Sequence, residues 1–398
     1  MAELNLFDDE LNRRLATLTE QGLRRELRRV DSPQGPRIET GGKTHRNFSS
    51  NDYLGIANHP ALKEAAIRAL EKFGAGAGAS RLICGSLAPF HELEETLAGF
   101  KKTEAALTFA TGYAAALGTI TALAGKDDIL ILDKLVHASI VDAAKLSGAK
   151  LRVFDHNDPG DLEKILIWAQ AKIAQQEPAA GQVIIVTEAI FSMDGDAAPL
   201  RELVTLKNKY GAWLMVDEAH ATGLYGADGR GLANELGVGN QIEIQMGTLG
   251  KALGASGGYI CGSRGLIDFL TNRARSFIFS TAPVPAAAAA ATAGIQLAQS
   301  PEGEARRKIL RQRVKKLRSE LRMATGEIDG AIIPIIIGDE AKAVAAAATL
   351  RAESIFIPAI RYPTVARGQA RLRVTLTAAH SEDDVAELVR ALTDLKTT

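Results

Sequence analysis

Short apolar runs alternate with stretches of helix length between residues 106 and 261, and this alternation limits the possible folds more than any other feature. A continuous apolar run followed by a helix-length segment is typical of a strand buried on both faces and joined to the next by a crossover helix. We therefore expect an α/β fold with a seven-stranded, mainly parallel sheet covered by helices on both faces. The predicted strands are Ala106–Phe109, Ile129–Leu132, Arg152–Phe154, Val183–Val186, Trp213–Val216, Glu243–Met246 and Gly258–Cys261.

The pattern changes after an alanine-rich segment that Pro283 and Pro285 suit as the start of a helix. Strands are predicted at Ile332–Ile337 and Ala370–Leu376, with a helix over Ala341–Glu353 between them. Ser381 and Asp384 have the spacing of a capping box, which predicts the start of a last helix. These elements indicate a smaller α+β domain.

The N-terminal segment differs from both of these regions. Leu4 to Val30 is charged and amphipathic, and we expect it to form one helix. The predicted organisation is an N-terminal helical arm (1–45), a large α/β domain (46–300) and a small C-terminal α+β domain (301–398).

Charge and cysteine content exclude several classes of protein. Lys plus Arg and Asp plus Glu both number 47, so nothing favours binding to nucleic acid or to an anionic membrane. The most apolar stretch, Val284–Leu297, is too short to span a membrane. Cys84 and Cys261 lie in unrelated contexts without metal-ligand spacing, and the N-terminus lacks the apolar core of a secretory signal. We expect a reduced, cytoplasmic protein without a metal site.

Polar residues follow the predicted strands, and in open α/β sheets ligands bind beyond the carboxyl ends of the strands. Lys251 comes soon after Glu243–Met246 and lies between Gly250 and several small residues. A lysine is most often a solvated surface charge. A partly desolvated amine has a lowered pKa and can attack a carbonyl carbon, and the small neighbours leave space for a planar group attached to it.

Other strand ends allow two interpretations each. Asp217 directly follows an apolar run, where an acid is commonly a cap or an ion-pair partner, but it could also hold a ring nitrogen protonated. His220 could reach the same ring, although an isolated histidine, like His137, is more often a hydrogen-bonded core residue. Gly112 and Tyr113 begin a predicted helix whose free amides favour phosphate, a weak signal because most strand–helix turns offer the same.

Together with these residues, a series of motifs resembles the α-oxoamine synthases, which are fold-type I enzymes dependent on pyridoxal 5′-phosphate (PLP). The resemblance runs in order from about residue 22 to 380. The matching segments are SNDYLG (50–55), GASRLICGS (78–86), DKLVHAS (133–139), TEAIFSMDGDAAPL (187–200), VDEAHATG (216–223), GTLGKALGASGG (247–258) and SFIFSTAPVP (276–285).

The resemblance implies a role for each matching position around the cofactor. Lys251 would bind PLP covalently and later move protons at the substrate Cα, Asp217 would pair with the pyridinium nitrogen, and His137 would stack on the ring. Ser280 or Thr281 would come from a second subunit, giving a homodimer with shared active sites; alternatively, Thr281 only caps its own helix. The further cofactor-binding residues implied by the resemblance are Gly112, Tyr113, Ser192, His220 and Thr248.

The resemblance also implies substrate-binding residues. Asn51 and Glu188 match positions at the substrate pocket. Arg361 would bind the carboxylate of the amino acid, which suits the planar fork of a guanidinium group. In the arm, Arg25 or its neighbour Arg24 would meet the acyl substrate.

The C-terminal segments AIRYPTV (359–365) and ARLRVTLTAAH (370–380) resemble the branch of the family that serves biotin synthesis. That branch condenses L-alanine with a pimeloyl thioester, carried by coenzyme A or an acyl carrier protein, and releases carbon dioxide and a free thiol. Glycine C-acetyltransferase and serine palmitoyltransferase are sister activities. A non-catalytic PLP-fold binding protein is a different class, which the intact Lys251, Asp217, His137 and Arg361 disfavour. Ala115 and Cys84–Leu87 depart from the family pattern near the expected acyl pocket.

Overall fold

The structure is a computed structural model that describes residues 2–175, 181–324, 328 and 330–397. Its centre is a seven-stranded sheet with the order β3-β9-β8-β7-β6-β4-β5, in which only β9 runs antiparallel to its neighbours. The predicted mainly parallel sheet is confirmed. The strands are β3 (Ala105–Phe109), β4 (Ile129–Asp133), β5 (Lys150–Phe154), β6 (Val183–Glu188), β7 (Trp213–Asp217), β8 (Ile244–Thr248) and β9 (Gly258–Gly262).

Helices cover both faces of this sheet, which explains why its strands read as continuous apolar runs. Ile129 and Ile131 of β4 pack in one core cluster, and Leu130 and Leu132 pack in the other, as the alternation of side chains along a strand requires. The first cluster includes residues of α3 (Ala88–Lys101), α6 (Pro159–Ala174), α7 (Leu200–Tyr210) and α11 (Pro285–Gln299). The second includes residues of α4 (Gly112–Leu123), α5 (Ala138–Ser147), α9 (Arg264–Arg273) and α10 (Arg275–Ile278).

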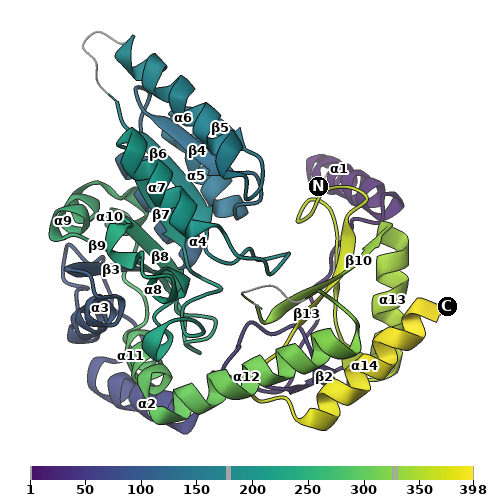
Figure 1. Ribbon diagram of the computed structural model, residues 1–398. Coiled ribbons are helices and arrows are strands. Elements are labelled where there is room, and N and C mark those ends of the chain that lie inside the picture. The colour runs from purple at the N-terminus through teal and green to yellow at the C-terminus, as the bar shows by residue number, and fades with distance from the viewer. Residues whose placement is uncertain (1, 176–180, 325–327, 329, 398) are drawn as a thin grey trace.

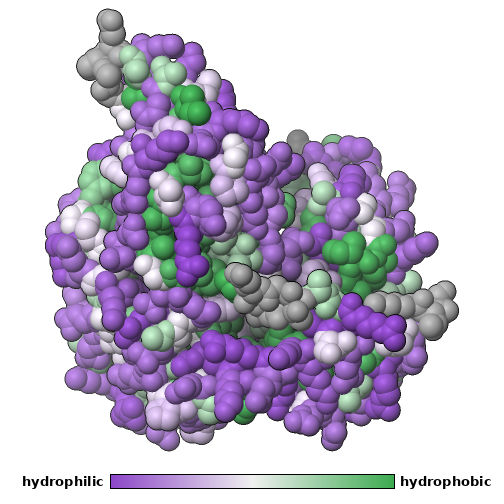
Figure 2. Space-filling model, in the orientation of Figure 1, coloured by the Kyte–Doolittle hydropathy of each residue, from purple (hydrophilic) through white to green (hydrophobic). Residues whose placement is uncertain are grey.

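The remaining helices of this lobe are peripheral. Helix α2 (Pro60–Phe73) packs against α11 (Figure 1). The segment after β7 holds the short elements η1 (Ala227–Gly229), α8 (Leu232–Glu235) and η2 (Gly239–Gln241). Hydrophilic side chains cover most of the face shown in Figure 2, and hydrophobic ones form smaller groups.

A second lobe contains the C-terminal part of the chain, and the long helix α12 connects it to the first (Figure 1). Its antiparallel sheet has the order β10-β13-β12, and a further sheet, β1-β2-β11, joins N-terminal strands to a C-terminal one. The predicted domain boundaries at 45 and 300 stay predictions. The elements are β1 (Arg37–Thr40), β2 (Lys43–Asn47), α12 (Pro301–Glu320), β10 (Ile332–Gly338), α13 (Glu340–Ala352), β11 (Ile355–Phe356), β12 (Ala359–Ile360), β13 (Ala370–Thr375) and α14 (Glu382–Thr397).

The ends of two helices can be compared with the predictions made from the sequence. Helix α1 covers Ala2–Glu20, so the prediction of one helix from Leu4 to Val30 is wrong in its second half. Gly22 adopts a φ of 66°, and the amide of Leu23 donates to the carbonyl of Leu18, which terminates the helix. The capping box before α14 is confirmed: Ser381 N donates to Asp384 Oδ2 at 2.8 Å, and Asp384 N donates to Ser381 Oγ at 3.0 Å.

Within the described residues, no helix combines the length and apolar character needed to cross a lipid bilayer. The same residues contain no cluster of three or more histidine, cysteine or acidic side chains arranged to bind a metal ion. Cys84 is exposed, whereas Cys261 is buried in β9, and both are free thiols.

Candidate active site

The carboxyl ends of β4, β6, β7 and β8 meet at one edge of the sheet because these strands run parallel. Glu188 ends β6 and lies opposite Asp217, the last residue of β7. Thr248 ends β8, and Lys251 follows it in the next turn. His137 caps the N-terminus of α5 just beyond β4. The structure therefore brings the predicted lysine, histidines and acids to a common edge.

Lys251 lies at one end of a chain of hydrogen bonds. Its Nζ is 2.7 Å from Nε2 of His220, and Nδ1 of His220 is 2.5 Å from the hydroxyl oxygen of Tyr53. Tyr53 in turn donates to Oδ1 of Asn51 at 3.3 Å. If Lys251 donates to Nε2, the proton of the neutral ring is on Nδ1 and points to Tyr53. This chain connects the amine to residues of the SNDYLG segment.

The electrostatic surroundings shift the Lys251 amine toward its neutral form. Burial lowers the pKa of Lys251 to about 8, because the opposing charges of Asp217 and Glu188 only partly offset desolvation, and Arg373 lowers it further. Burial also raises the pKa of Asp217 and of Glu188, while the nearby lysine charge acts in the opposite direction. A cationic group bound beside these carboxylates would be stabilised by them.

The two histidines at this edge are predominantly neutral at neutral pH. Burial, followed by the positive charge of Lys251, holds the pKa of His220 well below its usual value. Burial also lowers the pKa of His137, although the Asp217 carboxylate raises it in part. His137 Nδ1 is 2.8 Å from Oγ of Ser139, which orients the ring at the start of α5. A neutral ring of this kind can accept a proton or stack on an aromatic group.

The turn between β3 and α4 combines a helix N-terminus with a close approach to β8. Thr111 caps α4, and its hydroxyl accepts from the amide of Ala114 at 3.0 Å. A Cβ on Gly112 would lie 2.5 Å from Cγ2 of Thr248, so the backbone approaches β8 as closely as it does only because residue 112 is glycine. Oγ1 of Thr248 is buried and has no hydrogen-bond partner within the described residues. Free amides and an unpaired hydroxyl next to them suit an anionic ligand.

The other predicted residue of this turn lies farther out. Tyr113 is exposed, and its hydroxyl donates to Oδ2 of Asp142 at 2.7 Å. Ala115 of α4, which departs from the family pattern, is fully buried in the second core cluster.

Arg373 is the main site residue that the sequence reading missed. It is buried in β13 and donates to the carbonyl of Ser192 at 2.6 Å and to Oδ1 of Asn51 at 3.1 Å. Within the described residues no carboxylate forms an ion pair with it, and a buried guanidinium without an anion is costly. The available signal was a second arginine in ARLRVTL, on a predicted strand.

Arg361, the predicted carboxylate ligand, has different partners. Its guanidinium donates to the backbone carbonyls of Gly22 and Arg24 in the N-terminal arm. Arg25 donates to Oγ1 of Thr364 at 3.2 Å, so both predicted arginines lie where the arm crosses the turn after β12.

Ser192 and the pair Ser280 and Thr281 lie on separate segments. Ser192 is buried, and its amide donates to Oε2 of Glu188 at 3.2 Å. Thr281 is exposed and forms an isolated β-bridge with Ser80. Helix α11 begins at Pro285, and its cap residue is Val284, so the alternative that Thr281 caps this helix is wrong.

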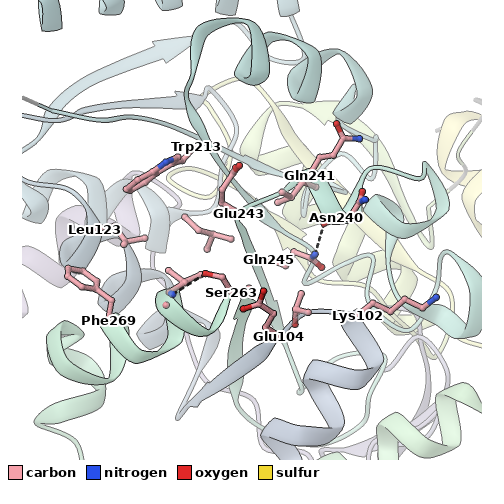
Figure 3. A pocket seen from close by; sticks show the side chains of 17 residues that line it. Lys102, Glu104, Leu123, Trp213, Asn240, Gln241, Glu243, Gln245, Ser263 and Phe269 are labelled. Atoms are coloured by element: carbon pink, nitrogen blue, oxygen red, sulfur yellow. Dashed lines mark hydrogen bonds between the residues drawn. The ribbon is translucent and has the colours of Figure 1, made fainter.

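A cavity of about 710 Å³ lies at the opposite edge of the sheet (Figure 3). It is lined by residues at the start of β7 and β8, among them Trp213 and Glu243, and by Phe269 of α9. None of the predicted site residues lines it. We place the candidate active site at Lys251, where the ionisable groups converge, and not at this cavity.

Comparison with known proteins identifies the family of this chain. The aminotransferase class I and II family matches residues 44–392. The 8-amino-7-oxononanoate synthase of Geobacter sulfurreducens is 46% identical over 381 residues, which cover 95% of each chain. The chain belongs to the α-oxoamine synthase family.

Solved structures extend the likeness of this α-oxoamine synthase to three dimensions. Serine palmitoyltransferase from S. paucimobilis, solved with PLP joined to myriocin, superposes with a TM-score of 0.89 at 29% identity and covers 98% of this chain and 97% of its own. An 8-amino-7-oxononanoate synthase from Francisella tularensis gives 0.73 at 26% identity, with 88% and 97% covered. The α-oxoamine synthase is therefore an enzyme of PLP fold type I, as predicted, and PLP is its cofactor.

Proposed function

We propose that this enzyme condenses L-alanine with a pimeloyl thioester to form 8-amino-7-oxononanoate, carbon dioxide and a free thiol, a step of biotin synthesis. The observation that carries the proposal is the partly buried Lys251 beside Asp217, His220 and Arg373 in a chain 46% identical to named 8-amino-7-oxononanoate synthases. The amine, the acids and the arginine match the needs of an amino-acid substrate and a carbonyl cofactor.

The site residues fit PLP. The unpaired Thr248 hydroxyl and the amides of Gly112 and Tyr113 would hold the phosphate. Asp217 would bind the ring nitrogen, because its buried carboxylate stabilises a cation, and His137 would stack on the ring. Ser192 and His220 would contact the ring hydroxyl. When bound, PLP supplies an electron sink for charge that develops at the substrate Cα.

The residues around Lys251 would handle the proton at the substrate Cα. Lys251 Nζ would hold the cofactor, and its amine, when not bound to the cofactor, would accept that proton. His220 lies within hydrogen-bonding distance of Nζ and, as a neutral ring, orients the amine without adding charge. Tyr53 is hydrogen-bonded to the other ring nitrogen of His220 and so fixes the orientation of the imidazole that contacts Lys251.

Arg373 would bind the carboxylate of alanine in place of the predicted Arg361. The support is its burial, its position beside Ser192 and Asn51, and the absence of an acidic partner within the described residues. Glu188 would line the same pocket. Arg361 and Arg25, held by the arm and its neighbouring turn, would then contact the acyl thioester, on coenzyme A or on an acyl carrier protein.

We further propose a cytoplasmic homodimer in which Ser280 and Thr281 reach the phosphate held by the partner subunit. The support is that Thr281 is exposed and free of a capping role in its own helix. Ile83 and Phe279, on the segments next to Thr281 and its bridge partner, are large exposed hydrophobic residues, 80% and 70% exposed, which a second copy would cover.

A substrate matrix tests the reaction. Alanine, glycine and serine are each combined with acetyl-, pimeloyl- and palmitoyl-CoA, and thiol release is followed. Alanine with pimeloyl-CoA should give the highest specificity constant. The rival with structural support is serine palmitoyl transfer, because a serine palmitoyltransferase superposes with a TM-score of 0.89. A higher specificity constant for serine with palmitoyl-CoA would favour that activity and contradict the proposal.

A further inference from the structure

His156 lies outside the residues assigned to the reaction, yet it joins two loops that carry such residues. It follows β5, and its side chain is only 24% exposed. Nδ1 is 2.9 Å from Oδ1 of Asp133, and Nε2 is 2.8 Å from Oδ2 of Asp196. Its ring meets that of Phe191 edge to face, with centroids 4.4 Å apart. Both ring nitrogens therefore donate to carboxylates, which requires the imidazolium form.

Asp133 connects this ring to the turn that presents His137. The Asp133 carboxylate is buried and also accepts the amide of Leu135 at 2.8 Å, two residues before His137. Its other oxygen accepts the amide of Asn157 at 2.9 Å. The position of the turn 133–137 thus depends on the charge and the position of the His156 ring.

Asp196 connects the same ring to the loop 190–197, which presents Ser192. The loop is closed by the Ile190–Ala197 bridge and by the amide of Phe191, which donates to the carbonyl of Asp196 at 3.0 Å. From the other lobe, Arg373 donates to the carbonyl of Ser192. The loop is therefore held on one side by His156 and on the other by the proposed substrate arginine.

The charge of this contact is stable over the physiological range. Burial alone would lower the pKa of His156, but hydrogen bonds and charges from Asp133 and Asp196 outweigh it and raise the pKa to about 10. Because the folded pKa exceeds the ordinary value of about 6.5, the stabilisation is complete below pH 6.5 and is lost as the pH rises through about 10.

We propose that His156 is a positioning residue that, through Asp133 and Asp196, holds the His137 turn and the Ser192 loop in the spacing that the cofactor ring requires. The inference rests on the proposed function for the roles of His137 and Ser192. It assigns His156 no contact with substrate or cofactor. Two charge-assisted hydrogen bonds from one partly buried ring are strong enough to order two loops at once.

The test compares His156→Leu, Asp196→Asn and wild type, with Lys134→Ala as the matched control. Lys134 belongs to the same turn, but its side chain only pairs with the exposed Asp155. Hydrogen–deuterium exchange of the cofactor-free protein is measured for 133–139 and 190–197, and PLP affinity is measured by absorbance titration. Thermal unfolding separates local from global effects.

We expect faster exchange in both segments for His156→Leu, in 190–197 for Asp196→Asn, and in neither for Lys134→Ala. The PLP dissociation constant should rise on the order of ten- to a hundredfold in His156→Leu, as when residues that orient ligand-binding groups are removed. If His156→Leu does not fold, Asp196→Asn, whose substituted side chain is 41% exposed, decides the question. Exchange and PLP affinity within twofold of wild type overturn the proposal.

Failure of the proposed function would give different results from failure of the His156 proposal. Wild type that binds PLP but condenses no alanine refutes the reaction, and the exchange and affinity data still judge His156. Nitrogen-15 NMR adds a readout that a packing role would not move: both ring nitrogens of His156 should carry protons at pH 8, and Asp196→Asn should lower the midpoint of the ring titration. A neutral His156 ring in wild type at pH 8 contradicts the proposal.

Discussion

At the scale of single residues, the chemistry of the site depends on burial. Lys251 and Asp217 are ordinary side chains in sequence, but at the edge of the sheet each loses most of its hydration. Desolvation disfavours both charges, and their mutual attraction only partly restores them. The site is therefore prepared for a ligand that brings a carbonyl to the amine and a cation to the carboxylate.

Lys251 should become reactive at a lower pH than a free lysine. With a pKa of about 8, the neutral amine fraction grows as the pH rises through 8, instead of through the ordinary value of 10.5. Borohydride trapping of PLP on the cofactor-free protein, followed by peptide mapping across a pH series, should give a midpoint near 8 and a label on Lys251. Lys251→Ala should abolish the label, and a pyridoxyl group on another lysine would contradict the assignment.

Substitution of Arg373 and substitution of Arg361 should affect the steady-state kinetics with alanine differently. Arg373→Lys removes the guanidinium fork from a buried position and should cost about 1.5–3 kcal/mol, the worth of hydrogen bonds to a charged group, in kcat/KM for alanine. Arg361→Lys should leave the KM for alanine within about threefold of wild type, since a loss below ~0.7 kcal/mol is expected where no substrate carboxylate is bound. The reverse ranking in steady-state assays would return the carboxylate to Arg361.

At the scale of elements, α4 must pack its first residue directly against the end of β8. This contact places the amides of the helix N-terminus beside the Thr248 hydroxyl, and it leaves no room for a side chain at Gly112. In the proposed function the helix would bind an anion because of Gly112 and of the Thr248 hydroxyl, which has no hydrogen-bond partner in the described part of the chain.

Gly112→Ala should test this contact. A Cβ placed 2.5 Å from Thr248 Cγ2 forces the helix and the strand apart, at a cost of about 1–3 kcal/mol for overpacking. We expect weaker PLP binding in absorbance titrations and a lower melting temperature. Gly99→Ala in α3 is the control, because nothing lies within 4 Å of its Cβ position; it should be neutral or slightly stabilising. Unchanged PLP affinity in Gly112→Ala would exclude the proposed phosphate site.

At the scale of the whole molecule, the site belongs to the junction of the two lobes. Arg373 comes from β13 of the C-terminal lobe, Asn51 from the segment after β2, and Lys251 from the turn after β8. Relative displacement of the lobes would separate Arg373 from the Lys251 amine. If Arg373 binds the substrate carboxylate as proposed, the position of the lobes would affect activity.

Subunit mixing should test the shared site. A Lys251→Ala dimer and a dimer carrying Ser280→Ala with Thr281→Val are each expected to be inactive or weak. In a mixed dimer with shared sites, one site collects both lesions and the other neither, so each mixed dimer should recover up to about half of the wild-type activity. Native mass spectrometry verifies that mixed dimers form. Mixed dimers without recovered activity would mean that each site is built within one subunit.

Sequence patterns predicted the sheet, and the family resemblance implied most of the cofactor-side residues. Short runs that are apolar on both faces, alternating with helix-length segments, are typical of buried strands between helix layers, and parallel strands bring the residues that follow them to one edge. Lys251 and Asp217 were therefore expected at one edge from the pattern, whereas the role of His137 was implied only by the resemblance; the capping box of α14 followed from its spacing. The same local logic failed for the end of α1, where the turn at Gly22 decided the boundary.

Only the tertiary structure decided the contacts between distant segments. Arg373 and Asn51 are 322 residues apart, Tyr53 and His220 are 167 apart, and Arg361 meets an arm residue 339 positions away. Periodicity reports which face of an element is buried, but it carries no information about which partner covers that face. Burial and pairing of these side chains, and with them the lowered pKa of Lys251 and the hydrogen bonds of Arg373, arise only when distant segments pack together.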